Sequence, residues 1–298
     1  MTTRVVKEFA ASKFMFSATI LVSAVVLAIA CGLFYKSIPI LRTQSLYSLF
    51  FSSSWHPSKG EFGFYPFIMG TIWVTVVAMA LATPPSLLMS VYLAEYAPSK
   101  VRIILKPMID LLAGIPSVVF GLWGVLLVVP LVSDYLAPWA GVTTTGYTVL
   151  AAGIVLAIMV SPIVISISDE VIRAVPHAVR EASMALGATK WQTVKHVVLR
   201  SSLSGIIAAI TLGFGRAFGE TMAVLMVAGN VPESPSSLFD PAYPIPALIA
   251  NNYGEMMSIP LYDSALLLAA LILLLTVAVF SFLAAMILAR IRKRYSVG

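Results

Sequence analysis

Long apolar stretches separated by short polar ones are the dominant pattern of this sequence. Six of these stretches are long enough to cross a hydrocarbon core, which takes about 20 helical residues. They cover residues 14–35, 67–93, 105–131, 147–167, 203–229 and 262–289. The pattern predicts an all-α polytopic membrane protein with six transmembrane helices.

Composition supports this prediction and excludes several kinds of chemistry. Of 298 residues, 59% are hydrophobic and 11% are charged, whereas a soluble domain carries about 25% charged residues. Cys31 is the single cysteine, and the three histidines (His56, His177 and His196) are scattered, so neither a disulfide nor a zinc site is expected. The sequence also lacks a P-loop. We therefore expect no metal and no cofactor in this chain, and no enzymatic activity of its own.

The first apolar stretch has two interpretations, because a basic segment with Arg4, Lys7 and Lys13 precedes it. A secretory signal has an apolar core of about 7–15 residues, whereas this run has about 20. Ala30-Cys31 resembles a lipoprotein cleavage site, but five more apolar stretches follow. The sequence favours a permanent anchor helix.

The positions of Lys and Arg predict the orientation in the membrane. Fifteen of the nineteen lie in the N-terminus, the second and fourth loops and the C-terminus, and three lie in the first loop. Cytoplasmic loops carry the excess of positive charge, so both termini are expected in the cytoplasm, with the protein in the cytoplasmic (inner) membrane. Of the outer segments, 36–66 is expected to be an ordered loop. The proline-rich 230–261 cannot form one helix, although Ile245–Tyr253 could form a short one.

The fourth loop contains signals for a helix, a tight turn and a second helix. Pro176 suits a first helical turn, Gly187 suits a left-handed end, and Thr189 with Gln192 has capping-box spacing. The first helix has a face of small residues: Ala178, Ala182 and Ala185. Such a face fits either a partner's groove or internal packing against the spans, and composition alone does not separate the two.

Two charged residues lie within the fifth apolar stretch. An Arg at the centre of a membrane helix costs from roughly 2.5 to above 10 kcal/mol. In a continuous helix, Arg216 and Glu220 would share one face and could form an ion pair. Gly215 and Gly219 have the Gly-x-x-x-Gly spacing that allows close helix packing.

This ion pair could be structural, but buried pairs contribute little net stability, and intramembrane charges often mark substrate pathways. The planar guanidinium of Arg216 suits an oxyanion. Our hypothesis is a gate in which Glu220 holds Arg216 in one state and releases it in another.

Other residues are expected to be structural. Asp110 is expected to pair with Lys106 at the membrane interface. A bend or close helix contact is expected near Gly114 and Pro116, and a break of the second span is expected at Pro84-Pro85.

Glu181-Ala182-Ser183, followed by Gly187, resembles the Glu-Ala-Ala…Gly loop of importer-type ABC transporter permeases. Ser183 takes the place of the second Ala, and Arg200 stands where that family usually has Pro. The resemblance implies that this loop forms coupling helices that dock into a groove on an ATPase subunit.

Gly215-Arg-Ala-Phe-Gly-Glu-Thr221 closely resembles the signature of the phosphate-specific (Pst) ABC permeases, and the residues after Thr221 are similar to the C-type subunit. Residues 92–98, 111–121 and 245–251 agree with that subunit. The resemblance implies a phosphate permease with three kinds of partner: a homologous second permease, an ATPase dimer that binds ATP and Mg²⁺, and an external phosphate-binding protein.

The expected organisation is an anchor helix and external loop over 1–66, an ABC permease transmembrane domain over 67–290 with its coupling loop at 176–199, and a basic tail over 291–298. Two alternatives remain open. The substrate could be another oxyanion (sulfate, molybdate or tungstate), or the chain could be a stand-alone secondary anion carrier.

Overall fold

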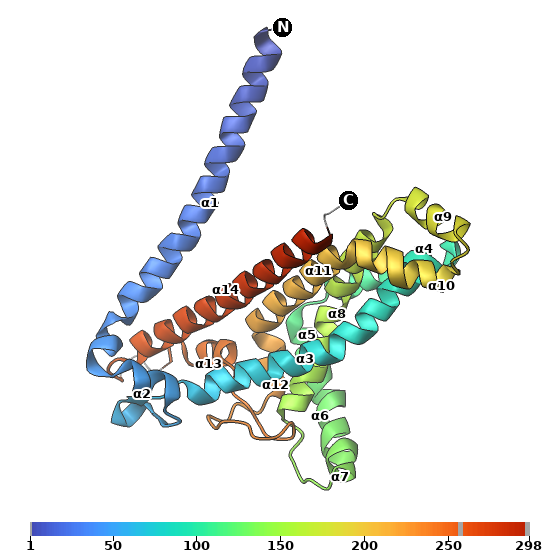
Figure 1. Ribbon diagram of the computed structural model, residues 1–298. Helices are drawn as coiled ribbons and strands as arrows, with labels where there is room; N and C mark the ends of the chain where they lie inside the picture. The colour runs from blue at the N-terminus through green and yellow to red at the C-terminus, as the bar shows by residue number, and fades with distance from the viewer. Residues whose placement is uncertain (1, 256–258, 296–298) are drawn as a thin grey trace.

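The computed structural model describes residues 2–255 and 259–295, and most of them are helical (Figure 1). The long helices are α1 (Thr2–Thr43), α3 (Tyr65–Val91), α8 (Val149–Arg173), α11 (Leu199–Gly219) and α14 (Tyr262–Tyr295). The shorter ones are α2 (Leu46–Phe51), α4 (Ser99–Ala113), α5 (Ser117–Trp123), α6 (Val129–Leu131), α7 (Ala137–Trp139), α9 (His177–Ala185), α10 (Lys190–Thr193), α12 (Met222–Val227) and α13 (Ile245–Asn252). π-Helical segments over 92–96, 124–128, 132–136 and 194–198 join several of them.

Six helices in the described part of the chain are long and apolar enough to cross a membrane, which confirms the predicted number. They cover Ala11–Thr43, Tyr65–Tyr96, Ser117–Trp139, Val149–Arg173, Lys190–Gly219 and Tyr262–Arg290. The third and fifth predicted spans differ most from the observed helices. The third span begins at Ser117 rather than at 105, because α4 is a separate amphipathic helix before it. The fifth begins at Lys190, since the helix runs on without a break past Arg200, and it ends at Gly219.

The prolines act differently in two spans. The bend near Gly114 and Pro116 is confirmed, since α4 ends at Ala113 and α5 begins at Ser117. The predicted break at Pro84-Pro85 was wrong, because α3 continues through both. This helix packs along α8, and such neighbours compensate for prolines inside a membrane helix.

Helix α8 lies at the centre of the main core and contacts α3, α11, α4 and α12. Its residues Val155, Leu156 and Val160 are at most 1% exposed. Close approach to α3 depends on Gly153, where an added Cβ atom would lie 2.5 Å from Val77 Cγ1. The smallest residues of α8 therefore set how closely the central helices pack.

A second core lies where α1 ends. The antiparallel hairpin of β1 (Trp55–His56) and β2 (Glu61–Phe62) places Trp55 against Phe62, Phe67 and Tyr262. Helix α13 joins this core, and the Ile245 amide donates a hydrogen bond to Thr71 Oγ1 at 2.9 Å. The prediction of a short helix after Pro244 is confirmed. The predicted 36–66 loop is ordered over 44–66, whereas its first residues belong to α1, which continues to Thr43.

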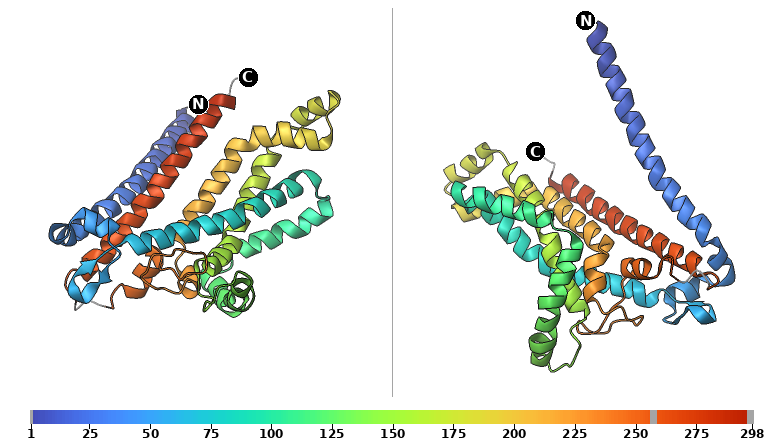
Figure 2. Two further views of the ribbon diagram at one scale, coloured as in Figure 1. Left: turned by 60° about the horizontal axis from the view of Figure 1, so that its bottom comes forward. Right: turned by 180° about the vertical axis from the view of Figure 1, so that it is seen from behind.

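The elements divide between two ends of the molecule (Figures 1 and 2). Helices α4, α9 and α10 gather at one end, on the same side as the end of α14. Helices α2 and α7 and the loop before α13 lie at the other end. Helix α1 diverges from the rest toward its N-terminus. Of the predicted tail over 291–298, helix α14 includes residues up to Tyr295, and 296–298 lie outside the described residues.

Candidate translocation and coupling sites

The fifth span is broken next to its charged residues. Helix α11 ends at Gly219, Glu220 has an extended backbone (φ −73°, ψ 125°), and α12 begins at Met222. The prediction of one continuous helix over 203–229 was therefore wrong. Glycine has low helix propensity, and the Glu220 carboxylate accepts a 3.4 Å hydrogen bond from the Ala223 amide at the start of α12. In a continuous helix the Ala223 amide would donate to a backbone carbonyl one turn earlier. Here it donates to the Glu220 side chain instead.

The break separates the two charges that a continuous helix would align. Among the residues that the structure describes, the Arg216 side chain forms no ion pair or hydrogen bond, with Glu220 or any other group. Arg216 is exposed on this chain, as are the apolar side chains of Leu212 before it and Met222 after it in the sequence. A guanidinium on lipid is costly, so this surface requires a protein partner or an aqueous path.

The packing predicted for Gly215 and Gly219 is not made by this chain. A Cβ atom added at either glycine would find nothing within 4 Å. At Gly213, by contrast, it would lie 2.9 Å from Val164 Cγ2, and at Gly205 it would overlap the Val171 side chain. The close contact of α11 with α8 is made by a different face, and tight packing at Gly215 and Gly219 stays a prediction for a partner helix.

The fourth loop has the predicted helix–turn–helix geometry. Helix α9 follows Pro176, and Gly187 adopts a left-handed φ of 86°. The capping box is confirmed: Thr189 Oγ1 accepts from the Gln192 amide at 3.3 Å, and Gln192 Oε1 accepts from the Thr189 amide at 2.8 Å. The second helix continues into α11 instead of ending before the span.

The residues that carry the family resemblance lie on the outside of this loop. Glu181, Ala182 and Gly187 are exposed, while Ser183 is half-buried and its Oγ lies 2.9 Å from Thr193 Oγ1. Large apolar side chains beside them are also exposed, including Leu186 at 91% and Trp191 at 55%. An exposed apolar patch of this kind is typical of a protein–protein contact.

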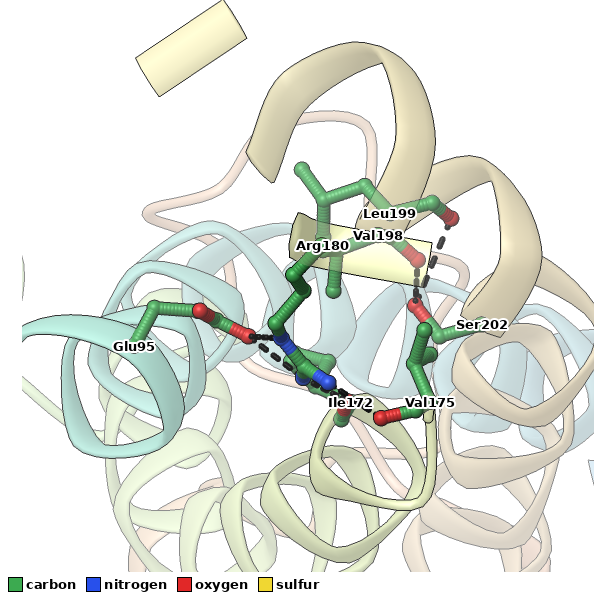
Figure 3. Close-up of polar contacts among 7 residues, drawn as sticks. All are labelled: Glu95, Ile172, Val175, Arg180, Val198, Leu199 and Ser202. Carbon is green, nitrogen blue, oxygen red and sulfur yellow. Dashed lines mark hydrogen bonds and ion pairs between the residues drawn. The ribbon is translucent and has the colours of Figure 1, made fainter. Parts of the chain in front are cut away.

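Sequence reasoning missed two ion-pair clusters close to this loop. Arg180 Nη2 lies 2.7 Å from Glu95 Oε1, and Arg102 Nη2 lies 3.1 Å from Asp169 Oδ2 (the first pair is shown in Figure 3). The available signal was the pair of acids, Glu95 and Asp169, each at the end of an apolar span that a cluster of cations follows.

The expected pair of Asp110 with Lys106 was wrong. Asp110 Oδ1 accepts a hydrogen bond from Ser166 Oγ at 3.2 Å. Lys106 Nζ instead lies 3.9 Å from Asp169 Oδ2 and 4.0 Å from Glu170 Oε1. Since α4 packs beside α8, acids from the neighbouring helix are available to this lysine.

Within residues 2–255 and 259–295, no group of His, Cys, Asp and Glu could hold a metal ion.

Comparisons with known proteins agree with this architecture. Residues 86–293 match the family model described as "Binding-protein-dependent transport system inner membrane component". The chain belongs to this family. It is a multi-pass subunit of the inner membrane, and members of its family work as permeases of ABC importers together with an ATPase and further subunits.

Curated relatives point in the same direction. The chain is 38% identical to the phosphate transport system permease protein PstC of Xylella fastidiosa (strain Temecula1), over 83% of this chain and 80% of the relative. It is 33% identical to PstC of Mesorhizobium japonicum, over 97% and 94%. It is also 37% identical to the probable ABC transporter permease protein YqgH of Bacillus subtilis, over 68% and 65%.

Solved structures share the fold. A bacterial ABC transporter that imports the polysaccharide alginate aligns with a TM-score of 0.59 at 13% identity, covering 96% of this chain and 99% of that one. The inward-facing MetNI methionine ABC transporter aligns with a TM-score of 0.57 at 18% identity, over 76% and 96%. The predicted importer-type permease fold is confirmed.

Proposed function

We propose that this chain is a membrane-spanning permease subunit of an ATP-driven ABC importer for inorganic phosphate. The curated relatives named PstC support the substrate. The observation that carries the proposal is Arg216, a cation exposed beside a break in a membrane span, without an ion-pair partner among the described residues. Such a group requires an anion, a partner subunit or both.

Phosphate suits this cation because it is a tetrahedral oxyanion, and the planar guanidinium can donate to two of its oxygens. Glu220 would repel the same anion. In this conformation its carboxylate accepts the Ala223 amide instead of holding Arg216. This arrangement is the released state of the proposed gate, and pairing of Glu220 with Arg216 would close it.

A homologous second permease would cover the exposed face of α11. Gly215 and Gly219 leave room there for a close helix contact, since nothing lies within 4 Å of a Cβ atom added at either residue. Arg216 lies between these two glycines in the sequence. A pathway at this heterodimer interface would therefore include Arg216 on one wall.

The energy source would be an ATPase dimer, which binds ATP and Mg²⁺ outside this chain. The exposed residues of the coupling loop (Glu181, Ala182, Ser183 and Gly187) and the apolar side chains beside them would dock into it. Both termini would lie in the cytoplasm: α9 and α10 gather on the same side as the end of α14 (Figure 1). An external phosphate-binding protein would deliver the anion at the other end.

Reconstitution of the complex in proteoliposomes tests this proposal. We expect ATP-dependent uptake of radioactive phosphate, and ATP hydrolysis that phosphate-loaded binding protein stimulates and sulfate does not. Stimulation by sulfate, molybdate or tungstate in place of phosphate would identify another oxyanion permease. Phosphate uptake by this chain alone, without the ATPase, would identify a secondary carrier instead.

A further inference from the structure

Arg180 is the one buried residue of helix α9, whose residues are all described. Its guanidinium lies against Glu95: Nη2 is 2.7 Å and Nε 3.0 Å from Glu95 Oε1, and the two side chains are 11% and 8% exposed. No apolar side chain of α9 is buried. The hold of this helix on the membrane spans is therefore largely polar: Arg180 attaches it to the second and fourth spans, and the 2.9 Å contact of Ser183 Oγ with Thr193 Oγ1 attaches it to the fifth.

The same guanidinium also contacts the end of the fourth span (Figure 3). Nη2 donates to the Ile172 carbonyl at 2.9 Å and Nη1 donates to the Val175 carbonyl. Ile172 belongs to the last turn of α8, and Glu95 to the π-helical segment that ends the second span. Arg180 thus connects α9 to two spans at once.

A second ion pair joins the fourth span to α4, the helix that follows the second span. Helix α4 follows the Glu95 segment, and its Arg102 lies 3.1 Å from Asp169 of α8. A displacement of Arg180 would therefore act on the ends of α3, α4 and α8 together, rather than on one helix alone.

The space beside the buried pair leaves room for such a displacement. A hollow of about 530 Å³ is lined by Glu95, Arg180 and residues of α4, α8, α9 and α10. Glu181 also lines this hollow, whereas the exposed Ala178, Ala182 and Ala185 lie on the opposite side of the helix from Arg180. One face of this helix is thus free for a partner, while the opposite face is attached to the spans through Arg180.

We propose that Glu95 and Arg180 are positioning residues that transmit the movement of α9 to the second and fourth spans. This inference rests on the proposed function, in which α9 docks to the ATPase. Without the pair, the ATPase would still bind α9 and hydrolyse ATP. A movement of α9 would then displace the second and fourth spans less, so less phosphate would be moved per ATP hydrolysed.

The test uses the full complex in proteoliposomes and measures phosphate moved per ATP hydrolysed. The variants are Glu95→Gln, Arg180→Gln and the double variant. We expect normal co-purification of the ATPase, basal ATP hydrolysis within twofold of wild type, and a ratio that falls at least fivefold in each single variant. Since the two residues act as one unit, the double variant should lose no more than either single one.

Arg173→Gln is the matched control, because Arg173 lines the same hollow, is exposed and has no ion pair within the described chain. Its ratio should equal that of wild type. A purely structural role would reduce the yield of complex and leave the ratio unchanged. An unchanged ratio in the single variants, or independent losses that add in the double variant, would overturn the inference.

If the glutamine variants do not assemble, Arg180→Lys replaces them, since it keeps the charge and loses the fork that reaches Glu95 and both carbonyls. A ratio at least twofold below wild type supports the inference, and a wild-type ratio refutes it. Failure of the proposed function is distinguishable, because the wild-type complex would then move no phosphate.

Discussion

The charges at the α9 end of the molecule and those at the break in the fifth span are arranged in opposite ways. At the α9 end, Arg180 meets Glu95 and Arg102 meets Asp169 within this chain. At the break, Arg216 has no ion-pair partner in the described chain, and Glu220 accepts a backbone amide. Charges that a chain satisfies itself hold its own helices together. A charge left exposed in a membrane span requires something from outside the chain.

The largest effect is expected at the exposed cation. Arg216→Gln should lower phosphate uptake by about 100-fold, because two charge-assisted hydrogen bonds to the anion together contribute roughly 3 kcal/mol. Uptake into proteoliposomes measures this effect, and co-purification of the partners shows that assembly is intact. Uptake by Arg216→Lys, which keeps the charge but loses the planar guanidinium, should lie between that of wild type and that of Arg216→Gln. Wild-type uptake by Arg216→Gln would remove this residue from the pathway.

A smaller effect is expected at a charge that forms an ion pair within the chain. Asp169 is 2% exposed, and Asp169→Asn should lower the free energy of unfolding by about 2 kcal/mol. Breaking a fully buried pair costs more, but the Arg102 side chain is 24% exposed. Thermal denaturation of the purified protein in detergent measures the change. Glu170→Gln is the control, since this side chain is 74% exposed and 4.0 Å from Lys106, and it should change stability by less than about 0.5 kcal/mol.

Glycines of α11 also differ in whether this chain packs against them: Gly205 contacts Val171, whereas Gly215 faces open space. Gly205→Ala should destabilise the chain by about 1 kcal/mol, because overpacking against Val171 exceeds the gain in helix propensity. Gly215→Ala should instead stabilise the isolated chain by about 0.5–1 kcal/mol, since a Cβ atom there has open space and alanine has the higher helix propensity. Gly215→Leu should instead weaken co-purification of the second permease. Unimpaired pairing in that variant would place the partner helix elsewhere.

The smallest effect is expected at Asp240 in the loop before α13. Ser236 Oγ and the Ser236 and Ser237 amides donate to its Oδ2 at 2.8, 2.9 and 2.8 Å, and these hydrogen bonds, led by that of the Ser236 hydroxyl, lower the pKa of the carboxyl. At a pH above the ordinary pKa of an Asp carboxyl, the ionised Asp240 stabilises the loop through these hydrogen bonds. This stabilisation is lost as the pH falls through the lowered pKa of Asp240.

Hydrogen-exchange protection of the Ser236 and Ser237 amides should therefore decrease in acid. Asp240→Asn should abolish this pH dependence, whereas Glu233→Gln, an exposed change in the same loop, should preserve it. Equal protection across the acid range would show that the carboxylate does not order the loop.

Several features of the fold could be predicted because they depend on neighbours in the sequence. Apolar runs of sufficient length predict spans, and Thr189 and Gln192 form their capping box with backbone groups three residues apart. Gly187 ends α9 in the left-handed conformation that glycine adopts without strain. Each of these features requires only the local chain.

Several outcomes depend on contacts between distant segments. Lys106 pairs with Asp169 rather than with Asp110, because α8 lies beside α4. Pro84-Pro85 leaves α3 unbroken while it packs along α8. The glycines that pack closely in α11 are Gly205 and Gly213 rather than Gly215 and Gly219. In each case the residue could have made the contact expected from the sequence. The helix that packs beside it determines which contact forms.

By itself the sequence determined that this chain has six membrane spans, a helix–turn–helix loop between the fourth and the fifth, and one arginine within a span, because hydropathy, charge position and capping are local properties. Only the tertiary structure decided that the fifth span breaks at Glu220, and that Arg180 attaches α9 to Glu95, 85 positions away in the sequence. The physical reason is that an ion pair or a broken helix is stable only where the surrounding helices supply its partners, and those helices come from distant parts of the chain.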